Sequence, residues 1–100
     1  MADVMLTLIV PDDLARPVED VLLSRPDLVP GFTSTAADGH GSAVALVAPS
    51  ELVEGHAPRN LIRLIGAESQ MRGVLALLRE QLPKARLFYW LVPVIEMGHL

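Results

Sequence analysis

The sequence has no cysteine, few aromatic residues and no long apolar run, and each absence excludes a class of protein. Without cysteine the chain forms no disulfide, no thiolate metal site and no cysteine nucleophile. Its apolar runs stay well below the ~20 residues of a membrane span, and its N-terminal residues lack the basic region of a signal peptide. We therefore expect a cytoplasmic protein that does not insert into a membrane.

Aromatic and basic residues are not arranged as a nucleic-acid-binding protein requires. The aromatic residues are confined to Phe32 and to Phe88, Tyr89 and Trp90. Residues 1–57 carry nine acids against two bases, a net charge of −7, and residues 58–100 carry six bases against three acids, a net charge of +3. Nucleic-acid binding needs a concentrated basic face, and RNA-recognition domains add stacked aromatic side chains. We expect no nucleic-acid partner.

The chain is short and apolar. One hundred residues correspond to one domain, and 51% of them are hydrophobic whereas only 20% are charged. A small domain has much surface to cover, so this excess of apolar residues indicates that part of the surface is buried against other chains. Homo-oligomerisation is the simplest arrangement that does this.

Hydrophobic periodicity predicts four strands and two helices. Residues 4–10 are apolar on both faces, which is typical of a central strand. Pro17 favours a separate turn at 12–15 or an irregular helix, and Pro93 indicates an edge strand or a bulge. A loop at 41–57 contains a possible short helix at 50–54. The expected strands are 4–10, 31–39, 58–67 and 85–95, and the expected helices are 17–24 and 69–82.

This element order predicts a ferredoxin-like α+β fold. The chain reads β-α-β-β-α-β as a single domain over residues 1–100. In that fold the antiparallel sheet has the order 4-1-3-2, both helices lie on one face, and here a long loop joins strands two and three. The second face of the first strand then needs a cover, which again favours an oligomer that packs sheet against sheet.

Other functions of this fold can be tested by residue type. A heavy-metal carrier domain needs a Cys-x-x-Cys pair, and acylphosphatase needs a phosphate cradle where this chain has two aspartates at 12 and 13. His40 lies near Ser42, but nothing in the sequence supplies the orienting acid of a catalytic serine. Six cations of the second half of the chain could bind a phosphate: Arg59, Arg63, Arg72, Arg79, Lys84 and Arg86.

Histidines at both ends of the long loop suggest a metal site as an alternative. His40 and His56 flank the loop, and Glu51 or Glu54 would complete a set of two histidines and one carboxylate. The opposing interpretation is that these are exposed loop residues with no partner.

Strand two and its loop resemble the PII signalling superfamily. The shared motifs are Gly31-Phe32-Thr33 at the start of the strand and the Gly39-His40-Gly41 break before the long loop. The closing segment 89–96, Tyr-Trp-Leu-Val-Pro-Val-Ile-Glu, is similar to a small proteobacterial subgroup of PII-like proteins associated with heavy-metal efflux systems. The resemblance covers nearly the whole chain in element order.

The resemblance implies a homotrimer with ligand-binding clefts between subunits and a membrane transporter as partner. By this analogy Gly31, Phe32, Thr33, Gly39, His40 and Gly41 lie at the cleft, and Arg59 joins them as a candidate for an anionic ligand. One feature departs from the superfamily, because residues 82–85 (Leu-Pro-Lys-Ala) lack the glycines of the phosphate-binding loop. ATP binding of the ordinary kind is therefore not expected, and neither ligand nor cofactor is specified.

The sequence thus predicts a non-enzymatic, trimeric PII-like regulator that binds a small molecule or a metal ion. Two alternatives stay open. One is a protein that binds a divalent metal directly through His40 and His56. The other is an amino-acid-binding module of the ACT type, which shares the fold and also binds ligands at interfaces.

Overall fold

The computed structural model describes residues 2–41 and 57–100 and contains four strands, a short 3-10 helix and two α-helices. In chain order the elements are β1 (Asp3–Pro11), η1 (Asp12–Leu14), α1 (Ala15–Leu23), β2 (Thr33–Gly39), β3 (Ala57–Ala67), α3 (Glu68–Gln81) and β4 (Phe88–Pro93). The predicted loop and the possible helix at 50–54 fall almost entirely outside the described residues.

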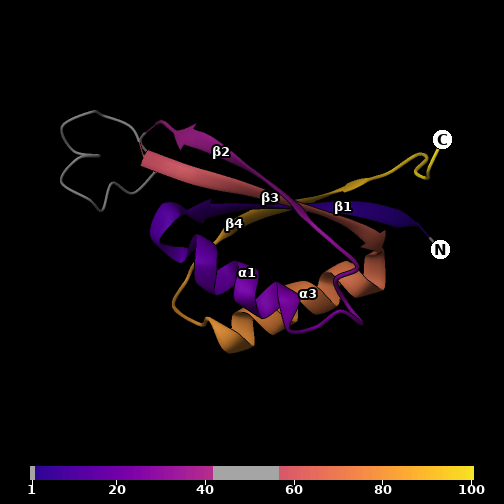
Figure 1. Ribbon diagram of the computed structural model, residues 1–100, viewed down its shortest axis with the longest axis horizontal. Coiled ribbons are helices and arrows are strands. Elements are labelled where there is room, and N and C mark those ends of the chain that lie inside the picture. Colours follow the sequence, from indigo (N-terminus) through magenta and orange to yellow (C-terminus); the bar gives the residue numbers. More distant parts are fainter. Residues whose placement is uncertain (1, 42–56) are drawn as a thin grey trace.

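The strands form one antiparallel sheet in the order β2-β3-β1-β4, as predicted. Both helices lie on the same face of this sheet (Figure 1). The central strands are β1 and β3, and each has a hydrogen-bonded neighbour on both sides. The sheet order and the single helical layer confirm the predicted ferredoxin-like fold.

Alternation along the central strands builds the core. Every second residue of β1 points to the helices and is buried, and β3 contributes Ile62 and Leu64. The apolar face of α3 packs on them, and Leu82, just after the helix, is partly buried. The buried core residues are Val4, Leu6, Leu8, Val10, Val18, Leu22, Val29, Ile62, Leu64, Met71, Val74, Leu75 and Leu78.

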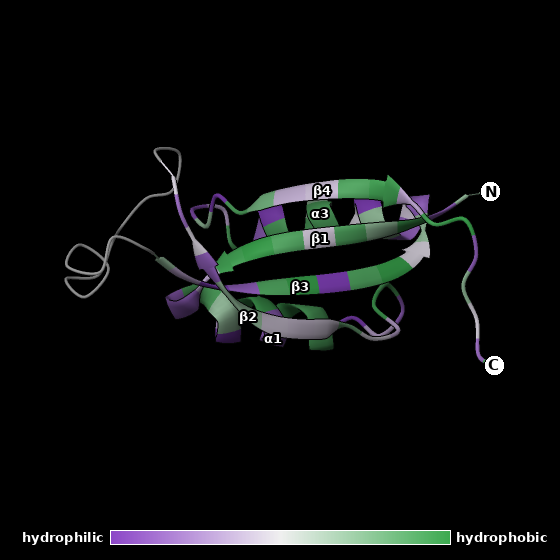
Figure 2. Ribbon diagram, turned by 90° about the horizontal axis from the view of Figure 1, so that it is seen from above, coloured by the Kyte–Doolittle hydropathy of each residue, from purple (hydrophilic) through white to green (hydrophobic). Residues whose placement is uncertain are grey.

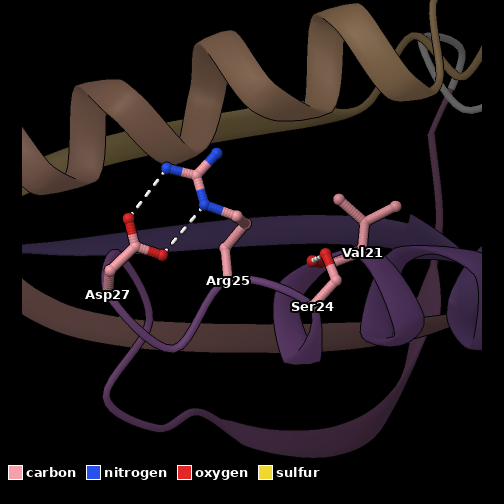
Figure 3. Close-up of polar contacts among 4 residues, drawn as sticks. All are labelled: Val21, Ser24, Arg25 and Asp27. Atoms are coloured by element: carbon pink, nitrogen blue, oxygen red, sulfur yellow. Dashed lines mark hydrogen bonds and ion pairs between the residues drawn. The ribbon is translucent and has the colours of Figure 1, made fainter.

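Pro17 is accommodated at the start of α1. A 3-10 turn over Asp12–Leu14 precedes the helix, so Pro17 lies in its first turn. Backbone N–H groups of a first turn have no partner within the helix, so the missing N–H of proline costs little there. Of the two alternatives that the sequence left open, the separate turn is the one present. At the other end of the helix, Ser24 Oγ donates to the Val21 carbonyl at 2.6 Å (Figure 3).

Two predicted strands are too long at their N-terminal ends. The fourth strand begins at Phe88, not at residue 85, because Arg86 adopts a left-handed backbone with φ of 51° that interrupts extended structure. The second strand begins at Thr33, so Gly31 and Phe32 precede it. Phe32 instead packs against the edge of the core, which holds it outside the ladder.

The face of the sheet opposite the helices carries a band of apolar side chains. Figure 2 views this face, and the pairing of β1 with β3 and β4 places on it Met5, Ile9, Leu61, Ile65, Phe88, Trp90 and Val92. Phe88 and Trp90 meet edge to face with ring centroids 6.0 Å apart, yet Phe88 is 66% exposed. In a single chain, no described element covers this band.

Candidate functional site

The predicted Gly-His-Gly break marks the end of β2. The strand ends at Gly39, and Gly41 has φ of 110°, a left-handed conformation that side chains other than glycine rarely adopt. His40 lies exposed between the two glycines. Glycine at position 41 therefore turns the chain out of the sheet at the start of the segment that follows.

Arg59 lies at the same end of the sheet as the break. It pairs with Ala37 of β2 and with Pro11 of β1, and Gly39 pairs with Ala57, two residues from Arg59. Only 8% of Arg59 is exposed, and its Nη1 donates to the Pro58 carbonyl at 2.9 Å. We call Gly39, His40, Gly41 and Arg59 the loop-end group.

The 3-10 turn after β1 is fixed to this end of the sheet. Asn60 Nδ2 donates to Asp12 Oδ1 at 3.1 Å, which joins β3 to η1 across 48 residues of sequence. Asn60 pairs with Val10, whose side chain faces the helices, whereas Arg59 belongs to the opposite face of the sheet. The Asp12 carboxylate and the Arg59 side chain therefore lie on opposite faces at this end of the sheet.

The other predicted ligand residues lie at the opposite end of β2. Gly31, Phe32 and Thr33, which we call the strand-start group, stand before or at its first residue. Six residues separate Thr33 from Gly39, so at about 3.3 Å per residue the two groups are roughly 20 Å apart. Within one chain, the structure does not bring the seven predicted ligand-binding residues together.

The predicted metal site is only partly described. His56, Glu51 and Glu54 lie outside the described residues, so the pairing of His40 with His56 stays a prediction. Over residues 2–41 and 57–100, no group of three or more histidine, aspartate or glutamate side chains is placed to hold a metal ion. No helix within the same ranges is long and apolar enough to cross a membrane.

The connection from α3 to β4 has few free backbone donors. The Leu82 N–H donates to the Leu78 carbonyl at 2.8 Å, the Ala85 N–H donates to the Leu82 carbonyl at 3.1 Å, and Pro83 has none. A phosphate cradle needs several backbone N–H groups that converge on one point. Residues 82–85 cannot supply one without breaking their own turn, which agrees with the absence of glycine there.

A cavity that the sequence did not predict lies between α3, β1 and the start of β4. It is partly open to solvent, has a volume of about 190 Å³ and is lined by Leu8, Leu75, Leu78, Arg79, Leu82, Pro83, Ala85, Arg86, Leu87 and Tyr89. Arg79 and Arg86 belong to the six cations noted as possible phosphate ligands, but nothing in the sequence places them at one cavity. Its walls come from three elements, which sequence periodicity alone cannot bring together.

The antiparallel sheet in the order β2-β3-β1-β4, with both helices on one face, is a ferredoxin-like fold (Figure 1). The chain belongs to the family described as "Protein of unknown function (DUF3240)", which matches residues 1–100. A DUF3240 family protein from Shewanella baltica OS155 has a similar structure, with a TM-score of 0.78 and 19% identity over 100% of this chain and 98% of that chain. No curated protein matches the chain.

Two further solved structures share the fold. One is CPII, a nitrogen regulatory PII-like protein from Thiomonas intermedia K12 bound to ADP, AMP and bicarbonate; its TM-score is 0.70 at 15% identity, over 100% of this chain and 97% of that chain. The other is a Bacillus cereus protein related to NIF3, with a TM-score of 0.69 at 17% identity, of which this chain spans 26%. At these identities the likeness establishes the fold alone.

Proposed function

We propose that this chain is a non-enzymatic PII-like regulatory protein that works as a homotrimer. It binds a small molecule or a metal ion in clefts between subunits and acts on a transport partner. The resemblance of its closing segment makes a heavy-metal efflux system the candidate partner. The likeness in fold to a nitrogen regulatory PII-like protein supports the regulatory class.

The observation that carries the proposal is the separation of the two ligand groups. Because the strand-start group and the loop-end group lie at opposite ends of β2, they can form one site only if different subunits contribute them. The apolar band on the helix-free face supports the same conclusion, since packing it against other copies removes Phe88 and Ile65 from water. A closed ring of subunits would bring the two groups together at each interface and would bury the apolar band.

The ligand is not held as a polyphosphate on backbone N–H groups, because Leu82 and Ala85 use theirs within the turn and Pro83 has none. A small anion, a nucleotide bound through side chains, or a metal ion fits the loop end better. His40 and Arg59 are the side chains of the loop-end group that offer a ligand nitrogen or a positive charge.

The test starts with the oligomer and then finds the ligand. Light scattering coupled to size exclusion should give the mass of three chains, and a monomer at micromolar concentration would overturn the trimer. A thermal-shift screen of nucleotides, bicarbonate, amino acids and zinc, copper and nickel salts should identify a stabilising ligand, because a ligand that binds only the folded state raises stability. A screen in which no compound raises the melting temperature would contradict the sensor proposal.

Subunit mixing then tests the shared site. Thr33→Ala and His40→Ala should each abolish binding of the compound that the screen identifies. Co-refolding the two variants in equal amounts should restore about a quarter of the sites, because each mixed trimer contains one interface with both groups intact. Binding that is lost in both variants and not restored by mixing would contradict a site shared between subunits, whereas binding that both variants retain would remove these residues from the site.

A further inference from the structure

The cavity between α3 and β4 combines an apolar floor with a basic rim. Leu75 and Leu78 of α3, both at least 94% buried, and Leu8 of β1 form its inner wall. The polar side chains that line it are those of Arg79, Arg86 and Tyr89. Among the described residues, no acidic side chain lines the cavity, so two cations face it without a lining carboxylate to neutralise them.

Arg79 is held in place at the rim by Tyr89. Its Nη2 donates to Tyr89 Oη at 3.2 Å, and its guanidinium carbon lies 5.8 Å from the centroid of the tyrosine ring. One such bond leaves further N–H groups of the guanidinium for a ligand, since arginine carries five. The side chain is therefore positioned without being saturated.

Arg86 lies near the β4 end of the connection between α3 and β4, and its backbone conformation is unusual. Its φ of 51° is the only positive value at a residue other than glycine within the described ranges. A left-handed residue of this kind costs about 1 kcal/mol or more relative to glycine, and such outliers concentrate at ligand sites. Glycine would relieve the strain at this position, yet the residue is arginine, and its side chain lines the cavity.

We propose that this cavity binds a small amphipathic carboxylate. The apolar body of the ligand contacts the leucine floor, and its carboxylate accepts hydrogen bonds from Arg79 and Arg86. The volume sets the size of the part that is buried, because an apolar cavity of about 150 Å³ holds a benzene ring and this one offers about 190 Å³. An aromatic or branched ring with a short carboxylate arm fits.

This site shares no residue with the two groups of the proposed inter-subunit cleft, although Leu82, Pro83 and Ala85 stand where the superfamily has its phosphate-binding loop. All of its lining residues come from one chain, and none belongs to the strand-start group or the loop-end group. It does not require an oligomer, so failure of the trimer proposal leaves it standing, and its own failure leaves the trimer proposal standing.

Phenylacetate and its neutral analogue phenylacetamide are the matched probes. Titrations of the ¹⁵N-labelled full chain, followed by NMR, should shift the amide signals of Leu78, Leu87 and Tyr89. We expect a phenylacetate Kd on the order of 1 mM or tighter. Phenylacetamide should bind roughly tenfold more weakly, since it lacks the charge-assisted bonds to the arginines. Equal binding of the two probes, or no shifts at the cavity, would overturn the proposal.

Three arginine variants locate the carboxylate. Arg79→Gln and Arg86→Gly should each weaken phenylacetate binding about tenfold and leave phenylacetamide binding unchanged. Glycine is chosen at position 86 because it adopts the observed φ without strain, so folding is preserved. Arg72→Gln is the control, because Arg72 lies on the same helix, bonds to Glu68 and does not line the cavity. If Arg72→Gln weakened phenylacetate binding equally, the effect would be a general electrostatic attraction, which would contradict the assigned site.

Discussion

Thr7 of β1 lies directly opposite Trp90 of β4, and its side chain is fully buried although it belongs to the sheet face that no helix covers. Within the described ranges its Oγ1 has no hydrogen-bond partner. A buried hydroxyl without a partner costs about 1–3 kcal/mol. Thr7→Val keeps the branched shape and removes the hydroxyl, so it should raise the free energy of unfolding by about 1 kcal/mol in urea titrations.

Thr35→Val is the matched control for that substitution. Thr35 lies on the same face in β2 but is exposed, so the same change should alter stability by less than about 0.5 kcal/mol. If Thr7→Val instead destabilises the protein while Thr35→Val does not, the hydroxyl is bonded in the assembled protein, to water or to another copy.

Charge on the helix-free face should dissociate the oligomer. Phe88 is 66% exposed in a single chain and stands at the edge of the apolar band. Phe88→Glu would bury a carboxylate between subunits, where an unpaired charge is strongly unfavourable. Light scattering should then give the mass of one chain, with the circular dichroism spectrum unchanged.

Leu23→Glu supplies a control of equal exposure. Leu23 is 67% exposed but ends α1 on the other side of the sheet. This variant should keep the mass of the unmodified protein. Dissociation by Leu23→Glu and not by Phe88→Glu would place the interface on the helical layer and contradict packing of sheet against sheet.

The fold was predictable because its signals are local. The run of residues 4–10 that is apolar on both faces, and the helical spacing of Met71, Val74 and Leu78, are visible in the sequence and match the central strand and the buried face of α3. The start of β4 was not predictable, because the left-handed backbone of Arg86 is not a preference of arginine.

The ligand site depends on more than one chain can show. The resemblance placed the motifs at Gly31 and Gly39 at a cleft between subunits, and within one chain the extended strand separates them by its full length, so that placement stays a prediction. The cavity was missed because Leu8, Leu75 and Tyr89 are far apart in sequence. Contacts of that kind depend on the sheet order and on the angle at which α3 crosses it, and no short motif encodes either.

Gly66 should resist substitution because of its neighbours. A Cβ at position 66 would lie 3.0 Å from Gln70 Oε1 and 3.1 Å from Met71 Cε. That same oxygen accepts a hydrogen bond from the Ala67 N–H at 3.1 Å, which satisfies a donor at the start of α3. Gly66→Ala should therefore lower the free energy of unfolding by about 1 kcal/mol.

A double-mutant cycle can show which neighbour of Gly66 causes the loss of stability. If displacement of the glutamine is responsible, Gly66→Ala should cost less in a Gln70→Ala background than in the unmodified protein. Gly98→Ala, where nothing lies within 4 Å of the added carbon, should be neutral. If the effects of Gly66→Ala and Gln70→Ala on the free energy of unfolding are fully additive, the cost arises from the contact with Met71 instead.

The ion pair between Arg25 and Asp27 predicts a pH dependence with a definite sign. Arg25 Nε and Nη2 donate to the two carboxylate oxygens at 2.9 and 2.8 Å (Figure 3). The hydrogen bond from Arg25 lowers the pKa of Asp27 below its ordinary value of 3.8. The stabilisation is therefore present above the unfolded-state pKa and is lost as the pH falls through the lower folded-state pKa. Asp27→Asn should destabilise the protein slightly at neutral pH and make no difference at about pH 2.

Solvent exposure limits that effect and provides its control. Both side chains are exposed, at 45% and 60%, so added salt should weaken the pair. Unfolding titrations of the unmodified protein and Asp27→Asn should converge both in acid and at about 1 M salt, where the Debye length is about 3 Å. If the two proteins still differ in free energy of unfolding in acid, Asp27 stabilises the turn after α1 through its own backbone rather than through Arg25.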